Sequence, residues 1–138
     1  MPRAQTAFLA RKDVPTRQAL QQAIDGLKLK LTLDDGYAPF KSLTYLPCTL
    51  DGEDAGFDIR FQDVDASFQA SANLQPQLGD KDVGILFRWG GDQREQASVL
   101  IVCAALAKNF GALVYDPDAD AVASADEILA KARKAASF

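Results

Sequence analysis

The sequence predicts an α+β fold, in which about three helices pack against one face of a single, mainly antiparallel sheet. The expected elements run β-α-β at the start, continue through hairpin strands and finish β-α-β-α. Helices separated by a run of antiparallel strands are typical of a two-layer sandwich rather than of a parallel α/β sheet. The length of 138 residues is that of one domain, so we expect residues 1–138 to fold together.

The N-terminal part is expected to form a strand, a helix and a second strand. Residues 4–10 can form the first strand, and residues 13–16 supply capping side chains and a proline suited to the first helical turn. Apolar residues then recur at helical spacing up to Leu27. Over residues 27–33, leucine alternates strictly with lysine and threonine, which predicts a strand with one buried face.

The middle of the chain is expected to form a hairpin followed by a long connection. Residues 44–50 and 57–64 have strand character and flank the acidic segment 51–56. That segment predicts a hairpin loop somewhat longer than a tight turn. Residues 67–80 are polar and contain a proline and a glycine, so an irregular connection is expected there.

The C-terminal part predicts two more strands and two more helices. A strand over residues 82–89 precedes two glycines, and a helix from about residue 92 ends at Phe110, before a glycine. A short strand over residues 112–115 and a turn lead to the last helix, for which Ser124 and Glu127 form a capping box.

The long helix near residues 92–110 carries an almost continuous apolar run from Ala97 to Ala107. A helix that is apolar nearly all round must be covered on several sides. We expect the sheet and the last helix to cover it, and a seam between two copies of the chain is the alternative.

Composition excludes several kinds of function. The chain has no histidine, which rules out Ser-His-Asp and Cys-His catalysis and His-ligated metal sites. The net charge of −4 is poorly suited to nucleic acid, whose binding depends on Lys and Arg neutralising phosphates. We expect no cofactor and no enzymatic activity.

The expected location is the cytoplasm. The N-terminus lacks the pattern of a signal peptide, and Cys48 and Cys103 are expected to be reduced structural thiols. The longest apolar run is shorter than the roughly 20 residues that a membrane-spanning helix needs, so no membrane association is predicted.

The charge is concentrated in the middle of the chain. Residues 31–92 carry eleven acids and four basic residues, whereas residues 1–30 carry two acids and six basic residues. Such an acidic region attracts a basic partner by electrostatic steering. The candidate contact residues are Asp51, Glu53, Asp54, Asp58 and the single tryptophan, Trp89.

Each candidate also has a structural interpretation. The acids of the hairpin can form a solvated face, and paired carboxylates can in principle hold a metal ion or transfer protons. Trp89 can pack in the core, and it becomes a contact residue if it proves exposed, because exposed tryptophan is enriched at binding hot spots.

A second acidic segment has the spacing of a calcium-binding loop. Asp116, Asp118, Asp120 and Glu127 occupy ligand positions 1, 3, 5 and 12 of that loop. Alanine replaces the glycine that the loop requires at position 6. The same residues are explained by a turn followed by a helix cap, so no metal is expected.

Residues 84–116 contain Phe-Arg-Trp-Gly-Gly, an alanine-rich helix and the start of Gly-Ala-Leu-Val-Tyr-Asp-Pro-Asp. This stretch resembles one found in small uncharacterised bacterial α+β proteins, some of which are immunity partners of secreted toxins. It covers about a quarter of the chain and contains no catalytic motif. The resemblance implies a small binding protein.

The leading hypothesis is therefore a non-catalytic binding protein that presents an acidic face to a basic protein partner, as an immunity-type inhibitor does. The first alternative is a metal-binding protein or enzyme that uses carboxylates alone. The second is a homodimeric structural or ligand-binding module with a pocket between the sheet and the long helix, which a filled core would exclude.

Overall fold

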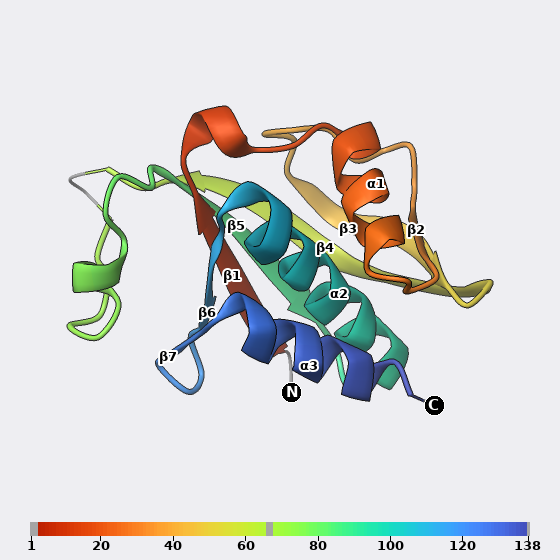
Figure 1. Cartoon of the computed structure of the whole chain (residues 1–138). Coiled ribbons are helices and arrows are strands. Elements are labelled where there is room, and N and C mark those ends of the chain that lie inside the picture. The colour runs from red at the N-terminus through yellow and green to blue at the C-terminus, as the bar shows by residue number, and fades with distance from the viewer. Residues whose placement is uncertain (1–2, 66–67, 138) are drawn as a thin grey trace.

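The computed structural model describes residues 3–65 and 68–137 of the chain (Figure 1). The strands are β1 (Arg3–Leu9), β2 (Leu31–Leu33), β3 (Leu43–Leu50), β4 (Glu53–Asp63), β5 (Val83–Trp89), β6 (Leu113–Asp116) and β7 (Ala121–Ala123). The α-helices are α1 (Arg17–Gly26), α2 (Gln93–Phe110) and α3 (Ala125–Ala135), and short 3-10 helices lie at Arg11–Asp13 and Gln75–Gln77.

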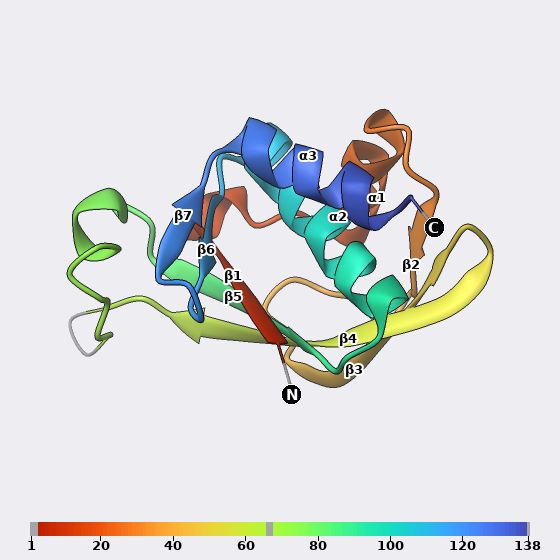
Figure 2. The same cartoon turned by 90° about the horizontal axis from the view of Figure 1, so that it is seen from below.

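The seven strands described form one sheet in the order β2-β3-β4-β5-β1-β6-β7, and every neighbouring pair is antiparallel. The three α-helices lie together on one side of this sheet, as Figure 2 shows. The predicted α+β architecture is therefore confirmed. Within the described residues, no helix is both long enough and apolar enough to cross a membrane.

Helix α2 lies at the centre of the helical layer. All ten residues from Ala97 to Leu106 are buried. The sheet lies beneath them, and the apolar faces of α1 and α3 pack against them from the two sides, through residues such as Leu20 and Ile128. The chain thus covers its own apolar helix, as expected, without a second copy.

Strand β1 is buried on both of its faces. Ala7 and Leu9 belong to the main core beneath the helices, whereas Phe8 points to the other side of the sheet. There it packs against Leu74 and Leu78, which lie in the long connection between β4 and β5. This connection covers the far face near β1, β6 and β7, and leaves the far face of β2 to β5 uncovered.

The predicted helix ends are confirmed. The Asp92 carboxylate caps α2 by accepting hydrogen bonds from the backbone N–H groups of Arg94 and Glu95, and Gly111 ends the helix in the left-handed conformation (φ 72°). Ser124 and Glu127 form the reciprocal capping box at the start of α3. These short-range signals depend only on neighbouring residues.

Three predicted details were wrong. The hairpin between β3 and β4 closes through Asp51 and Gly52 alone, with φ of 54° and 80°, which are the values of a type I′ turn. Strand β2 starts at Leu31 rather than residue 27, because Leu27 is the C-cap of α1 and Lys28 takes a positive φ of 64°. Strand β7 (Ala121–Ala123) was not predicted, because its three residues fall in the segment expected to be a turn before the last helix.

The outer edge of β2 is closed by a side chain from α1. The Gln21 amide donates to the carbonyl of Leu31 (2.7 Å) and accepts from the N–H of Leu33 (2.8 Å). The Arg17 guanidinium also donates to the Leu33 carbonyl (2.5 Å). Unpaired edge strands invite pairing with other chains, so these two side chains block that contact.

We expect Gln21→Ala to lower the free energy of unfolding by about 1–3 kcal/mol, because two hydrogen bonds to the β2 backbone are lost. Urea denaturation measures the change. Gln22→Ala, an exposed position on the same helix, is the control and should change stability by less than about 0.5 kcal/mol. Equal effects of the two substitutions would contradict this role of Gln21.

Candidate functional site

The uncovered half of the sheet carries aligned polar side chains. Thr32 pairs with Thr49, and Thr49 pairs with Asp54, across β2, β3 and β4. Residues paired in register point to the same side of a sheet. The apolar residues next to them point the other way, into the core beneath the helices. This row therefore lies on the face turned away from the helices, which we call the open face.

A hollow of about 380 Å³ lies beside this row, lined in part by Asp34, Asp35 and Asp54. Arg17 also lines it, and its guanidinium lies 3.4 Å from the Asp35 carboxylate. Three carboxylates thus face one guanidinium around the hollow. The surface they form, here called the acidic hollow, retains a negative charge that a basic group can neutralise.

The four acids predicted as one contact face are divided by the fold. Asp54 and Asp58 lie at alternate positions of β4 on the open face, where Asp58 is opposite Arg88 on β5. Asp51 lies in the hairpin turn. Glu53 forms an ion pair with Arg94 of α2 (3.0 Å), so it is turned toward the helical side.

Asp34 and Asp35 line the acidic hollow but are not among the residues that the sequence predicted for a site. They form a turn after β2, in which Asp34 accepts a hydrogen bond from the N–H of Gly36 (2.8 Å). The pairing of β2 with β3 and of β3 with β4 brings this turn near Asp54. The one sequence feature that could have indicated this location is that Asp34 and Asp35 directly follow the strand predicted over residues 27–33.

Tyr45 is an exposed aromatic residue on the open face, with half of its surface accessible (50%). A side chain at Gly56 would place its Cβ 2.2 Å from the tyrosine ring, so glycine is required beneath the ring. Burial and the nearby Glu95 carboxylate raise the pKa of Tyr45. The hydroxyl stays neutral at physiological pH and available for hydrogen bonding.

Trp89 does not lie on a contact face. Its side chain is only 7% exposed and belongs to the core with Phe87 and Ile85 on the helical side of β5. Its indole Nε1 is buried without a hydrogen-bond partner in the described structure. Alternation along β5 points Trp89 inward, so the exposure on which its candidate contact role depended is absent and the core interpretation applies.

The acids with calcium-loop spacing are engaged in local hydrogen bonds. Asp116 accepts from the N–H groups of Asp118 (2.9 Å) and Ala119 (3.3 Å). Asp120 accepts from the hydroxyls of Ser71 and Tyr115, both at 2.6 Å, and these bonds lower its pKa. Glu127 caps α3.

The same acids do not assemble into a ligand set. Among residues 3–65 and 68–137, no three Asp, Glu or Cys side chains come together as metal ligands would. The spacing in this segment is thus accounted for by a turn and a helix cap.

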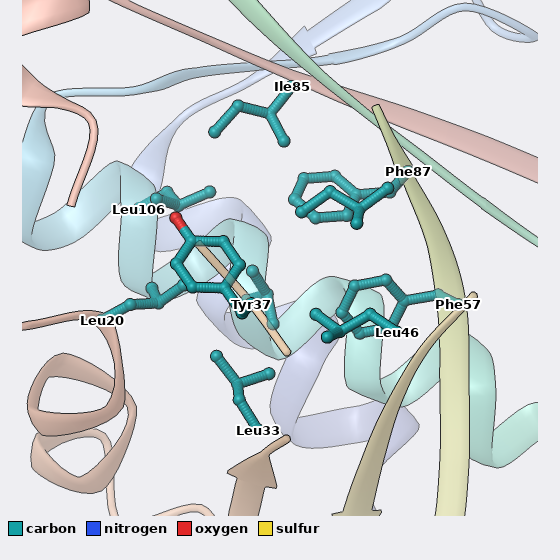
Figure 3. A pocket seen from close by; sticks show the side chains of 10 residues that line it. Leu20, Leu33, Tyr37, Leu46, Phe57, Ile85, Phe87 and Leu106 are labelled. Atoms are coloured by element: carbon teal, nitrogen blue, oxygen red, sulfur yellow. The ribbon is translucent and has the colours of Figure 1, made fainter. Parts of the chain in front are cut away.

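The space between the sheet and α2 is filled by side chains. Figure 3 shows the apolar residues there, including Leu20, Phe57 and Phe87, around the ring of Tyr37. The space left between them does not admit a water molecule. The Tyr37 hydroxyl donates to the carbonyl of Pro15 (2.9 Å), and burial raises its pKa to about 12. A small-molecule pocket is not present at this place.

Both cysteines are buried free thiols. Burial raises the pKa of Cys48 to about 11 and raises that of Cys103 as well. Because the thiolate is the reactive form, a thiol with a raised pKa is a poor nucleophile at neutral pH. This agrees with the structural role expected for both residues.

The chain has no match among protein-family models, curated proteins or solved structures. The charge and geometry of its own surface are therefore the main basis for a functional proposal. The open face also carries the exposed side chains of Arg60 and Arg88 on β4 and β5, so its excess of negative charge is confined to the acidic hollow.

We expect Trp89→Phe to change the free energy of unfolding by less than about 1.5 kcal/mol, because it keeps an aromatic ring and removes an unpaired buried donor. Trp89→Ala should cost about 3–5 kcal/mol by leaving a cavity. Both variants lack the single tryptophan of the chain, so tryptophan fluorescence cannot follow their unfolding. Far-UV circular dichroism during urea unfolding measures both changes. A large loss in Trp89→Phe would show that the indole N–H is needed.

Neither thiol should react with a disulfide reagent in the folded protein at pH 8, because both pKa values are raised well above that pH. Reactivity of Cys48 should increase as the pH approaches about 11. Unfolding in guanidinium should release two thiols per chain. Rapid release of one thiol from the folded protein would contradict the burial argument.

Proposed function

We propose that this chain is a non-catalytic protein-binding domain whose open face docks a basic protein partner, as an immunity-type inhibitor does. The observation that carries the proposal is the acidic hollow, in which carboxylates from the turn after β2 and from β4 surround one concavity. It lies on the half of the sheet that no other element covers.

The chemistry of the open face suits recognition. Asp54 has no ion pair or side-chain hydrogen bond within the described structure, so its charge is available to a partner. Exposed Tyr45 adds an aromatic surface of the kind enriched at binding hot spots. Opposite charge across an interface raises the association rate and rejects partners of like charge.

The same features argue against catalysis by this face. A catalytic carboxylate pair requires an apolar environment that separates the two pKa values. Asp34, Asp35 and Asp54 are all exposed to water. The buried thiols have raised pKa values, and the chain contains no histidine.

The immunity-type role rests on two supports. Residues 84–116 resemble a stretch of small bacterial proteins that include immunity partners of secreted toxins. An acidic surface can also block the basic substrate site of a toxin that acts on nucleic acid, since such a site must bind phosphate.

The test is capture of a partner from the native host by the tagged full-length chain at low salt, followed by binding kinetics. We expect one specific basic protein. Asp54→Lys should weaken its binding at least tenfold, mainly through slower association that depends on ionic strength.

Asp80→Lys is the matched control, because it makes the same charge change at an exposed position of the connection between β4 and β5. It should leave the affinity within about twofold. Equal weakening by both variants, or no specific partner at low salt, would refute the proposed role of the open face.

A further inference from the structure

A second hollow, of about 700 Å³, lies on the helical side of the sheet, away from the open face. Its walls come from the N-terminal half of α2 and the C-terminal half of α3, and its floor comes from the start of β1 and the end of β6. Apolar lining comes from Leu100 and Ala135, and the polar lining residues are Gln5, Gln93, Gln96, Asp116, Lys131, Lys134 and Ser137. We call it the amide groove.

Two glutamines of the amide groove, Gln5 and Gln96, lie half-buried on faces whose neighbouring residues are apolar and buried. Gln5 lies on the same side of β1 as the buried Ala7 and Leu9, and pairs in register with the buried Phe87. On α2, Gln93 and Gln96 share a face with the buried Leu100 at i, i+3 and i+7 spacing. The space between the sheet and the helices is therefore polar at the groove, whereas it is apolar further along β1 and α2.

These side chains have no partners within the described part of the chain. No hydrogen bond or ion pair involves the side chains of Gln5, Gln93 or Gln96, although Gln5 and Gln96 are half-buried. Elsewhere, Gln21 and Gln77 use their amides to bind backbone carbonyls. The amides of Gln5, Gln93 and Gln96 are therefore free to donate to and accept from a ligand that displaces water from the groove.

The charged residues of the amide groove favour an anion. Lys131 and Lys134 lie one helical turn apart on α3 and are free of ion pairs in the described structure. The acid that lines the groove, Asp116, already accepts hydrogen bonds from the N–H groups of Asp118 and Ala119. Two ammonium groups against one engaged carboxylate leave the groove with a net positive charge.

We infer that the amide groove binds a small polar molecule that carries a phosphate group. Lys131 and Lys134 neutralise the phosphate, for which lysine serves as a point charge. The glutamine amides each offer donors and an acceptor to hydroxyl or carbonyl groups on the remainder of the molecule. The inference does not depend on the proposed function, because the groove lies on the other side of the sheet.

The full chain is titrated by isothermal calorimetry with ribose 5-phosphate, inorganic phosphate and ribose. The three probes separate the contribution of the phosphate group to binding from that of the sugar hydroxyls. We expect ribose 5-phosphate to bind in the micromolar to low-millimolar range, inorganic phosphate to bind more weakly, and ribose alone to give no measurable binding. Absence of binding by both phosphate probes at low salt would overturn the inference.

Substitutions of residues that line the amide groove test whether the phosphate probes bind there. Lys131→Gln combined with Lys134→Gln should weaken both phosphate probes about tenfold or more, since charge-assisted hydrogen bonds are lost. Gln96→Leu should weaken ribose 5-phosphate and leave inorganic phosphate unchanged.

Arg133→Gln is the matched control, because it removes one positive charge from the same helix at a residue that does not line the groove. It should leave both affinities unchanged. Suppose that Arg133→Gln weakens binding of the phosphate probes as much as the double lysine substitution does. The probes are then attracted by the overall positive charge of α3, and the groove is not a binding site.

Discussion

The burial of α2 on every side is the constraint on which the rest of the structure depends. Ten consecutive residues, from Ala97 to Leu106, are buried, and each large aliphatic side chain among them contributes about 1.5–3 kcal/mol of apolar burial. A sheet covers only one side of a helix, so both α1 and α3 must lie beside α2 in the same layer. All three α-helices are therefore used on one face, and the other face of β2 to β5 stays uncovered.

The uncovered face obtains its chemistry from strand register. Side chains alternate along β4, so Phe57 and Ile59 enter the core while Asp54 and Asp58 face outward. A slip of one residue would exchange the two sets. The two-residue turn at Asp51 and Gly52 fixes that register, and Asp51 therefore has a structural role whether or not it meets a partner.

The sequence was most informative where a structural feature depends on neighbouring residues. The start of α2 at about residue 92, the capping box at Ser124, the glycine stop after α2 and the buried character of α2 were all predicted correctly. The inward direction of Trp89 was also available in principle, because Ile85, Phe87 and Trp89 alternate with Gly84, Leu86 and Arg88. That alternation favours the core position of Trp89, which the structure shows.

Features that depend on residues far apart in the chain could not be predicted in this way. Asp34 and Asp35 meet Asp54 only because β2, β3 and β4 are neighbours in the sheet. The amide groove likewise combines residues from β1, α2, β6 and α3. Periodicity assigns a residue to a face of its own element, and the order of strands then decides which faces meet.

The two hollows also change the meaning of the net charge of −4. The acidic hollow and the amide groove lie on opposite sides of the sheet and carry opposite local charge. Interactions between solvent-exposed charges are largely screened beyond about 8 Å at physiological ionic strength, and a packed sheet separates the two surfaces. Each surface is therefore governed by its own side chains, so an acidic protein can offer a cationic groove to an anion while its open face attracts a basic partner.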